Sequence, residues 1–84
     1  MNIPAHYSDK LSLDEQILYV LSLMKKGAAS EVAMELVELK GISSEEAVAD
    51  LTLETEQELE KLNAAGCVEI VRERGEKKRY VLKT

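Results

Sequence analysis

The hydrophobic pattern at the start of the chain has the spacing of an amphipathic helix. Ser12 and Glu15 match a capping box, in which the two side chains bind opposite backbone amides of the first helical turn. The main apolar stripe that follows is formed by Leu13, Ile17, Leu21 and Met24. The pattern therefore predicts a helix over residues 11–26.

A second helical pattern follows over residues 30–40. Ser30 is its predicted N-cap, and Gly41 ends the segment at a position where glycine relieves a left-handed conformation. The apolar face of this helix is formed by Val32, Ala33, Leu36 and Val37. We expect that face to be buried.

Residues 42–65 allow two interpretations. A break near residues 51–53 would give a short helix at 44–50, capped by Ser43 and Glu46, and a longer helix at about 54–65. Thr52 can cap a helix, and β-branched threonines lower helix propensity, so we favour this break. The alternative is one long helix with a single stripe of Val48, Leu51, Thr55, Leu59 and Leu62.

The end of the chain has the composition of a β-hairpin. Residues 67–73 and 79–83 are rich in strand-forming side chains. A three-residue loop at 75–77 gathers the apolar side chains on one face and sets opposite charges against each other on the other face. The apolar face then carries Val68, Ile70, Tyr80 and Leu82. The other face pairs Glu69 with Lys83, Val71 with Val81, and Glu73 with Arg79.

Length and cysteine content limit the organisation of the protein. With 84 residues the chain forms one domain, and we expect a flexible arm over residues 1–10 and the domain over residues 11–84. Cys67, the single cysteine, cannot form an intrachain disulfide and fits a reducing compartment. The sequence has no apolar run of about 18 residues and no signal-peptide pattern. We therefore expect a cytoplasmic protein without a membrane partner.

The junction between the last helical segment and the hairpin resembles that of the winged-helix family. The family pattern is Leu-x-x-Leu-x-x-x-Gly-hydrophobic-Val, and the sequence here is Leu59-Glu60-Lys61-Leu62-Asn63-Ala64-Ala65-Gly66-Cys67-Val68. The resemblance covers most of residues 12–84. It implies an α+β, mainly α fold: a winged helix-turn-helix of three to four helices followed by a C-terminal β-hairpin wing at 67–84.

The helices before this junction can be matched to the family in two ways. Residues 43–51 resemble the helix that precedes the recognition helix, which makes residues 30–40 an inserted helix. Alternatively, residues 30–40 are themselves the helix before the recognition helix.

Charge is divided unevenly along the chain. Residues 1–66 hold five bases and thirteen acids, whereas residues 67–84 hold six bases and three acids. The resemblance implies a transcription-regulator-like protein, and a basic wing of this kind can contact the phosphates of double-stranded DNA. The six predicted nucleic-acid-binding residues are Arg72, Arg74, Lys77, Lys78, Arg79 and Lys83.

The predicted recognition helix has the wrong charge for DNA. Residues 54–61 contain four acids and one base, and a recognition helix lies between phosphate walls that repel carboxylates. The alternative function is therefore an acidic winged-helix protein–protein interaction module of a larger assembly that binds no DNA. Its basic protein partner would meet residues 54–61.

Catalytic equipment is scarce in this sequence. One histidine, His6, and one cysteine, Cys67, do not supply the three or four ligands of a metal site. We expect no enzymatic activity, no metal and no cofactor.

Three apolar side chains of the first predicted helix lie partly off its main stripe: Leu18, Tyr19 and Leu23. Either the helix at 30–40 covers them, or they form the face of a homodimer. Winged-helix proteins often pair through their first helix, so the resemblance implies the second possibility.

Overall fold

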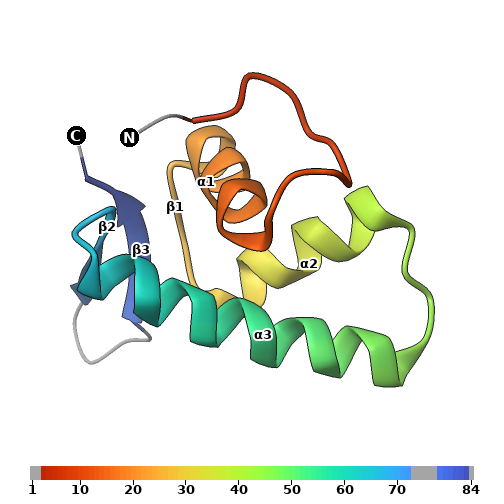
Figure 1. Ribbon diagram of the computed structural model, residues 1–84. Coiled ribbons are helices and arrows are strands. Elements are labelled where there is room, and N and C mark those ends of the chain that lie inside the picture. The colour runs from red at the N-terminus through yellow and green to blue at the C-terminus, as the bar shows by residue number, and fades with distance from the viewer. Residues whose placement is uncertain (1–2, 73–77, 84) are drawn as a thin grey trace.

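The computed structural model describes residues 3–72 and 78–83, and these residues form an α+β fold that is mainly helical (Figure 1). The described residues contain three helices, α1 (Leu13–Met24), α2 (Ala29–Lys40) and α3 (Glu45–Ala64), and three strands, β1 (Lys26–Gly27), β2 (Val68–Arg72) and β3 (Lys78–Leu82). The strands form one antiparallel sheet in the order β1-β3-β2. No helix in the described residues is both long and apolar enough to span a bilayer.

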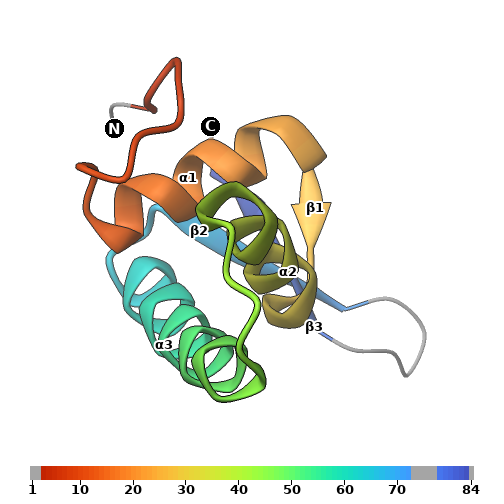
Figure 2. The same cartoon turned by 90° about the vertical axis from the view of Figure 1, so that its right-hand side faces the viewer.

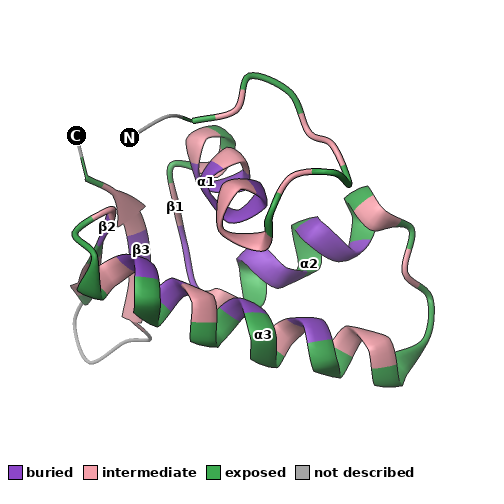
Figure 3. Cartoon of the chain, viewed as in Figure 1, coloured by how far each residue is buried: buried purple, intermediate pink, exposed green. Residues whose placement is uncertain are grey.

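The helices and the sheet enclose one apolar core. Helices α1 and α2 lie across α3, and the sheet lies at the C-terminal end of α3 (Figures 1 and 2). The buried positions of each helix face the other helices (Figure 3). The completely buried side chains are Ile17, Leu21, Val32, Ala33, Leu36, Leu59, Thr55 and Tyr80.

The first two helices begin with a glutamate that binds the backbone just before it. The Glu15 carboxylate accepts a hydrogen bond from the Ser12 backbone N–H at 3.3 Å, as the predicted capping box requires. At the start of α2 the Glu31 carboxylate accepts from the Ala28 N–H at 2.8 Å. Ala28 is therefore the N-cap residue, and the prediction of Ser30 was wrong.

Helix α3 is continuous, so the predicted break near residues 51–53 is wrong. The Thr52 hydroxyl donates to the Val48 carbonyl oxygen at 2.8 Å and is thus satisfied inside the helix instead of capping a new one. Packing also favours continuity, because one face of the whole helix is buried. That face carries Leu51, Thr55, Leu59 and Leu62.

The turn between α2 and α3 differs slightly from the expected one. Gly41 ends α2 with a φ of 68°, in the left-handed region that glycine adopts without steric cost. The cap of α3 is Ser44, whose side chain accepts from the Ala47 N–H at 3.4 Å. The N-cap is therefore one residue later than predicted, and the expected box of Ser43 with Glu46 does not form, because Ala47 is at position N3.

The hairpin has the predicted faces but not the predicted register. The structure sets Val68 opposite Leu82 and Ile70 opposite Tyr80, whereas Glu69 lies opposite Val81. Apolar residues thus meet directly on the core face, where the expected register would have set Tyr80 against Arg72. The shift of two positions keeps every side chain on its expected face, since side chains alternate along a strand. Glu73 and the loop at 75–77 lie outside the described residues.

A third strand, β1, replaces the end of the predicted first helix. Helix α1 stops at Met24, and Lys25 turns the chain with a φ of 69°. Lys26 and Gly27 then pair with Val81 and Tyr80 of β3. Gly27 packs closely against α1, because a Cβ atom there would require the Met24 side chain to move.

Candidate functional site

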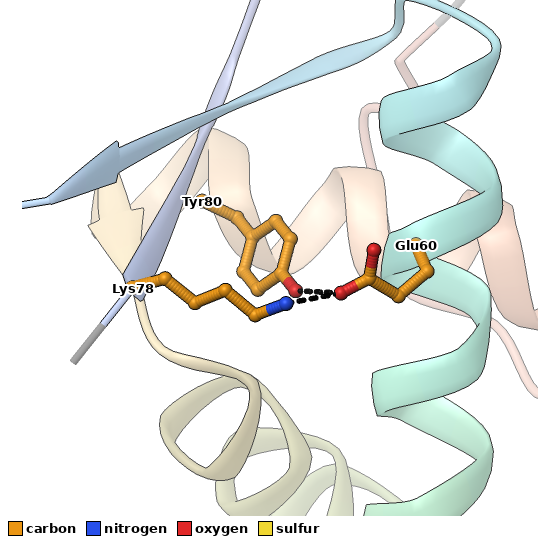
Figure 4. Close-up of polar contacts among 3 residues, drawn as sticks. All are labelled: Glu60, Lys78 and Tyr80. Carbon is orange, nitrogen blue, oxygen red and sulfur yellow. Dashed lines mark hydrogen bonds and ion pairs between the residues drawn. The ribbon is translucent and has the colours of Figure 1, made fainter.

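The hairpin is fastened to α3 by a polar cluster of three residues (Figure 4). Tyr80 is completely buried at the centre of β3, and its hydroxyl donates to Oε1 of Glu60 at 3.0 Å. The Lys78 ammonium donates to the same oxygen. It also lies 5.8 Å from the centroid of the Tyr80 ring, within cation–π range. The Lys78 ammonium of the hairpin and the Glu60 carboxylate of α3 therefore neutralise each other.

The cluster shifts the pKa of each member in the direction that stabilises the ion pair or its hydrogen bonds. The hydrogen bond from Lys78, followed by that from Tyr80, lowers the pKa of Glu60. The hydrogen bond to Glu60 raises the pKa of Lys78. Burial, and then the hydrogen bond to Glu60, raises the pKa of Tyr80. At neutral pH the cluster thus consists of a carboxylate, an ammonium and a neutral phenol.

The remaining predicted DNA-contacting cations are spread over both faces of the hairpin. Arg72 is exposed opposite Lys78, while the half-buried Arg79 points to the other face opposite Val71. The Lys83 ammonium lies 3.9 Å from the Glu69 carboxylate, so this ion pair forms although the two residues are not directly opposite. Arg74 and Lys77 lie outside the described residues.

Helix α3 presents an acidic surface to solvent. Glu45–Ala64 contains seven acids and one base, Lys61. Towards its C-terminus the carboxylates have basic partners: Glu58 lies 3.8 Å from Lys61, and Glu60 binds Lys78. Among residues 3–72 and 78–83, no base forms an ion pair with the acids from Glu45 to Glu56.

The predicted homodimer face is not a single exposed surface. Leu18 is buried in the core, and the ring of Tyr19 is half-buried, with its centroid 6.2 Å from that of Tyr7. Leu23 is 65% exposed and lines a small groove of about 220 Å³ between α1 and α2. Of these three side chains Leu23 alone is largely exposed, and the homodimer stays a prediction.

The N-terminal segment packs against α1 from residue 7 onwards (Figure 1). The Tyr7 hydroxyl donates to Asp9 at 2.6 Å, and the Lys40 ammonium lies 6.0 Å from the Tyr7 ring centroid. Burial and the hydrogen bond to Asp9 raise the pKa of Tyr7 to about 12. Gln16 of α1, only 2% exposed, donates through Nε2 to the carbonyl oxygens of Ser8 at 3.2 Å and Leu11 at 3.1 Å. These contacts hold residues 7–11 on α1.

A groove of about 470 Å³ lies between this N-terminal segment, the start of α1 and the first half of α3. Its apolar lining comes from Leu11, Leu13, Ile42 and Leu51. Its charged lining comes from Asp9, Asp50, Glu54 and Lys40. Gln16 is the most deeply buried polar residue of the lining. The groove combines apolar surface with an excess of acid.

Metal-ligating side chains do not converge within the described parts of the chain. His6 is exposed in the N-terminal segment, and Cys67 is half-buried at the start of the hairpin. The absence of enzymatic activity and of a cofactor stays a prediction.

Two residues of these sites were missed in the sequence. Glu60 was assigned to the acidic helix without a partner, because its contacts Lys78 and Tyr80 lie about twenty positions away and leave no local signal. Gln16 was missed as well. Its position directly before the apolar residues Ile17 and Leu18, which are buried, was the one feature of the sequence that could have indicated its burial.

Comparison of the chain with models of protein families, with curated proteins and with solved structures found no match.

Proposed function

We propose that this chain is a winged-helix protein-interaction module that binds a basic protein partner through the acidic surface of α3. The observation that carries the proposal is the charge of that helix, which has seven acids and one base. In its first half these acids are exposed or line a groove, and within the described chain they have no basic partner. A basic partner gains electrostatic complementarity there, which speeds association and selects against acidic competitors.

The arrangement of elements supports the winged-helix part of the proposal. The hairpin follows α3 directly, and the short strand β1 between α1 and α2 extends its sheet. In this arrangement α2 is the helix before the recognition helix, and α3 is the recognition helix. An inserted helix is then unnecessary.

The acidic charge of α3 disfavours binding of this helix in the major groove of DNA. Carboxylates on a recognition helix are repelled by the flanking phosphates, and few base edges donate hydrogen bonds to them. Lys78, one of the predicted phosphate contacts, is bound to Glu60 of that helix. Using Lys78 on DNA would leave Glu60 without its cation.

Double-stranded DNA bound through the wing is the second candidate. The observation that favours it is the charge of residues 67–84, with six bases and three acids, and the exposed position of Arg72 on β2. Phosphate contacts of this kind weaken steeply as salt is raised, because they release counterions.

One titration distinguishes the two candidates. Fluorescence anisotropy would measure binding of a labelled mixed-sequence duplex and of a labelled lysine- and arginine-rich peptide, at about 50 mM and about 200 mM salt. We expect the peptide to bind and the duplex not to bind. Replacing Glu46, Asp50, Glu54 and Glu56 by their amides should weaken the peptide complex by about tenfold or more. Duplex binding that is lost in Arg72→Ala and unchanged in the amide variant would establish the second candidate instead.

A further inference from the structure

The groove between the N-terminal segment, α1 and α3 has a charge imbalance that the fold does not resolve. Asp9, Asp50 and Glu54 line it, and among the described residues Lys40 is the one cation in its lining. The Lys40 ammonium lies over the ring of Tyr7 and forms no ion pair with the lining acids. Asp50 and Glu54 likewise have no basic partner within residues 3–72 and 78–83. The groove thus offers two uncompensated carboxylates on successive turns of one helix.

An unused acceptor lies in the lining of the same groove. Gln16 is 2% exposed, and both hydrogen bonds of its side chain are made by Nε2, to Ser8 and Leu11. Its carbonyl oxygen Oε1 accepts no hydrogen bond from the part of the chain that the structure describes. Thr55 Oγ1 is the one completely buried side-chain polar atom without a partner in the described residues, so Gln16 Oε1 retains some access to solvent. It can therefore accept a hydrogen bond from a donor that enters the groove.

The apolar part of the lining selects the shape of the ligand. Leu13 and Ile42 are half-buried, and Leu51 is 7% exposed. A ligand that fits must place hydrocarbon against these side chains and several N–H donors against carboxylates and an amide oxygen. The arginine side chain has this composition, with an apolar stem and a planar guanidinium that carries five N–H donors. Lysine has a similar stem but offers a compact point charge that cannot make paired contacts.

We propose that this groove binds an arginine side chain, together with an apolar neighbour, from a basic segment of a protein partner. The guanidinium binds Asp50, Glu54 and the Gln16 amide oxygen, and the apolar neighbour packs on Leu13 and Leu51. The volume of about 470 Å³ lies within the range of ligand pockets and holds more than one side chain. This inference rests on the proposed function, because it specifies which part of the acidic surface carries the recognition.

The test uses the full chain labelled with ¹⁵N and three short peptides of the same length. The first alternates arginine with leucine, the second replaces each arginine by the uncharged citrulline, and the third replaces it by lysine. We expect the arginine peptide to shift the side-chain NH₂ signal of Gln16 and the backbone signals of Asp50 and Glu54. The citrulline peptide should bind about tenfold more weakly or worse.

Matched variants separate the groove from the rest of the helix. The double variant Asp50→Asn with Glu54→Gln should lower the affinity for the arginine peptide by about tenfold. The control variant Glu46→Gln with Glu56→Gln removes the same charge from the same helix outside this groove. It should lower the affinity for the arginine peptide by less than about threefold. All four side chains are exposed, and the ¹⁵N spectrum of each variant verifies its fold.

Each contrary result identifies which proposal fails. If both double variants weaken the arginine peptide equally, or if the lysine peptide binds as tightly as the arginine peptide, the groove is not an arginine site and the acidic-surface proposal stands. If neither cationic peptide binds, both proposals are overturned. Signal changes confined to α3 residues outside the groove also overturn the arginine site.

Discussion

The two halves of α3 are both acidic but use their acids differently. In the C-terminal half Glu60 binds Lys78 and Tyr80 of the hairpin, and Glu58 lies beside Lys61. In the N-terminal half Asp50 and Glu54 line a groove and have no cation from the described chain as a partner. The C-terminal half uses a carboxylate to position the hairpin, whereas the carboxylates of the N-terminal half stay available.

Some acids of α3 stabilise the folded chain, and others do not. Glu45 and Glu46 lie in the first turn of α3, where the positive end of the helix dipole favours acids. Asp50 and Glu54 lie beyond that turn, and the dipole effect falls off within it. Neither the helix dipole nor an ion pair within the described residues accounts for these two carboxylates, and the proposed function gives them a contact with a partner.

The largest expected effect is a loss of stability when the contact between the hairpin and the C-terminal half of α3 is removed. Tyr80→Ala removes a completely buried aromatic side chain and should lower the free energy of unfolding by about 3–5 kcal/mol. Tyr80→Phe keeps the ring and removes only the hydrogen bond to Glu60, and should cost about 1 kcal/mol. Urea unfolding measures both. Equal losses in the two variants would mean that the hydroxyl, and not the packing of the ring, holds the hairpin on α3.

A smaller effect on stability, of opposite sign, is expected for a substitution near the middle of α3. The Thr55 hydroxyl is completely buried and is the one buried side-chain polar atom without a partner in the described residues. Thr55→Val should therefore raise the free energy of unfolding by about 1 kcal/mol, which in a domain of this size raises Tm by about 4–8 °C.

Thr52→Val is the matched control for that change. The Thr52 hydroxyl donates to the Val48 carbonyl oxygen, so its removal should give no such gain. Stabilisation of the same size in both variants would mean that valine improves α3 generally, and that the unpaired hydroxyl of Thr55 carries no cost.

Local features of this fold were predictable from the sequence, and long-range contacts were not. The apolar stripe of α2, the Glu15 cap and the two faces of the hairpin depend on neighbours within a few residues, and each was confirmed. The continuity of α3 was mispredicted, because Thr52 satisfies its hydroxyl within the helix and the burial of a whole helix face outweighs a weak local propensity.

The candidate sites were less predictable than the helices. Strand β1 has two residues and exists only by pairing with β3, which lies more than fifty positions away. Lys78 was predicted as a free phosphate contact, but its partner Glu60 comes from another element. The groove joins three separate segments, so its carboxylates were visible in the sequence and their grouping with Gln16 was not.

The ion pair at the C-terminal half should make a small, pH-dependent contribution to stability. The folded protein lowers the pKa of Glu60 below its ordinary value of 4.5, so its contribution is present above that pH and is lost as the pH falls through the folded pKa. The raised pKa of Lys78 keeps that side chain charged over the same range.

Glu60→Gln tests that contribution. Urea unfolding should show a lower stability than the parent at pH 7 and a smaller difference at pH 3, because the parent then loses the carboxylate that the variant lacks. A difference that stays the same at both pH values would show that Glu60 acts through packing or neutral hydrogen bonds and not through its charge.

The smallest effect on stability is expected at the acids that line the groove. Asp50→Asn with Glu54→Gln removes two exposed carboxylates that have no ion-pair partner in the described chain. The free energy of unfolding, measured in urea, should therefore change by no more than about 0.5 kcal/mol per site. Removing like charges from an acidic helix relieves repulsion, so any change should be a gain that shrinks as salt is raised. A clear loss of stability would instead show that these acids serve the fold, as Glu60 does, and the contrast between the two halves of α3 would disappear.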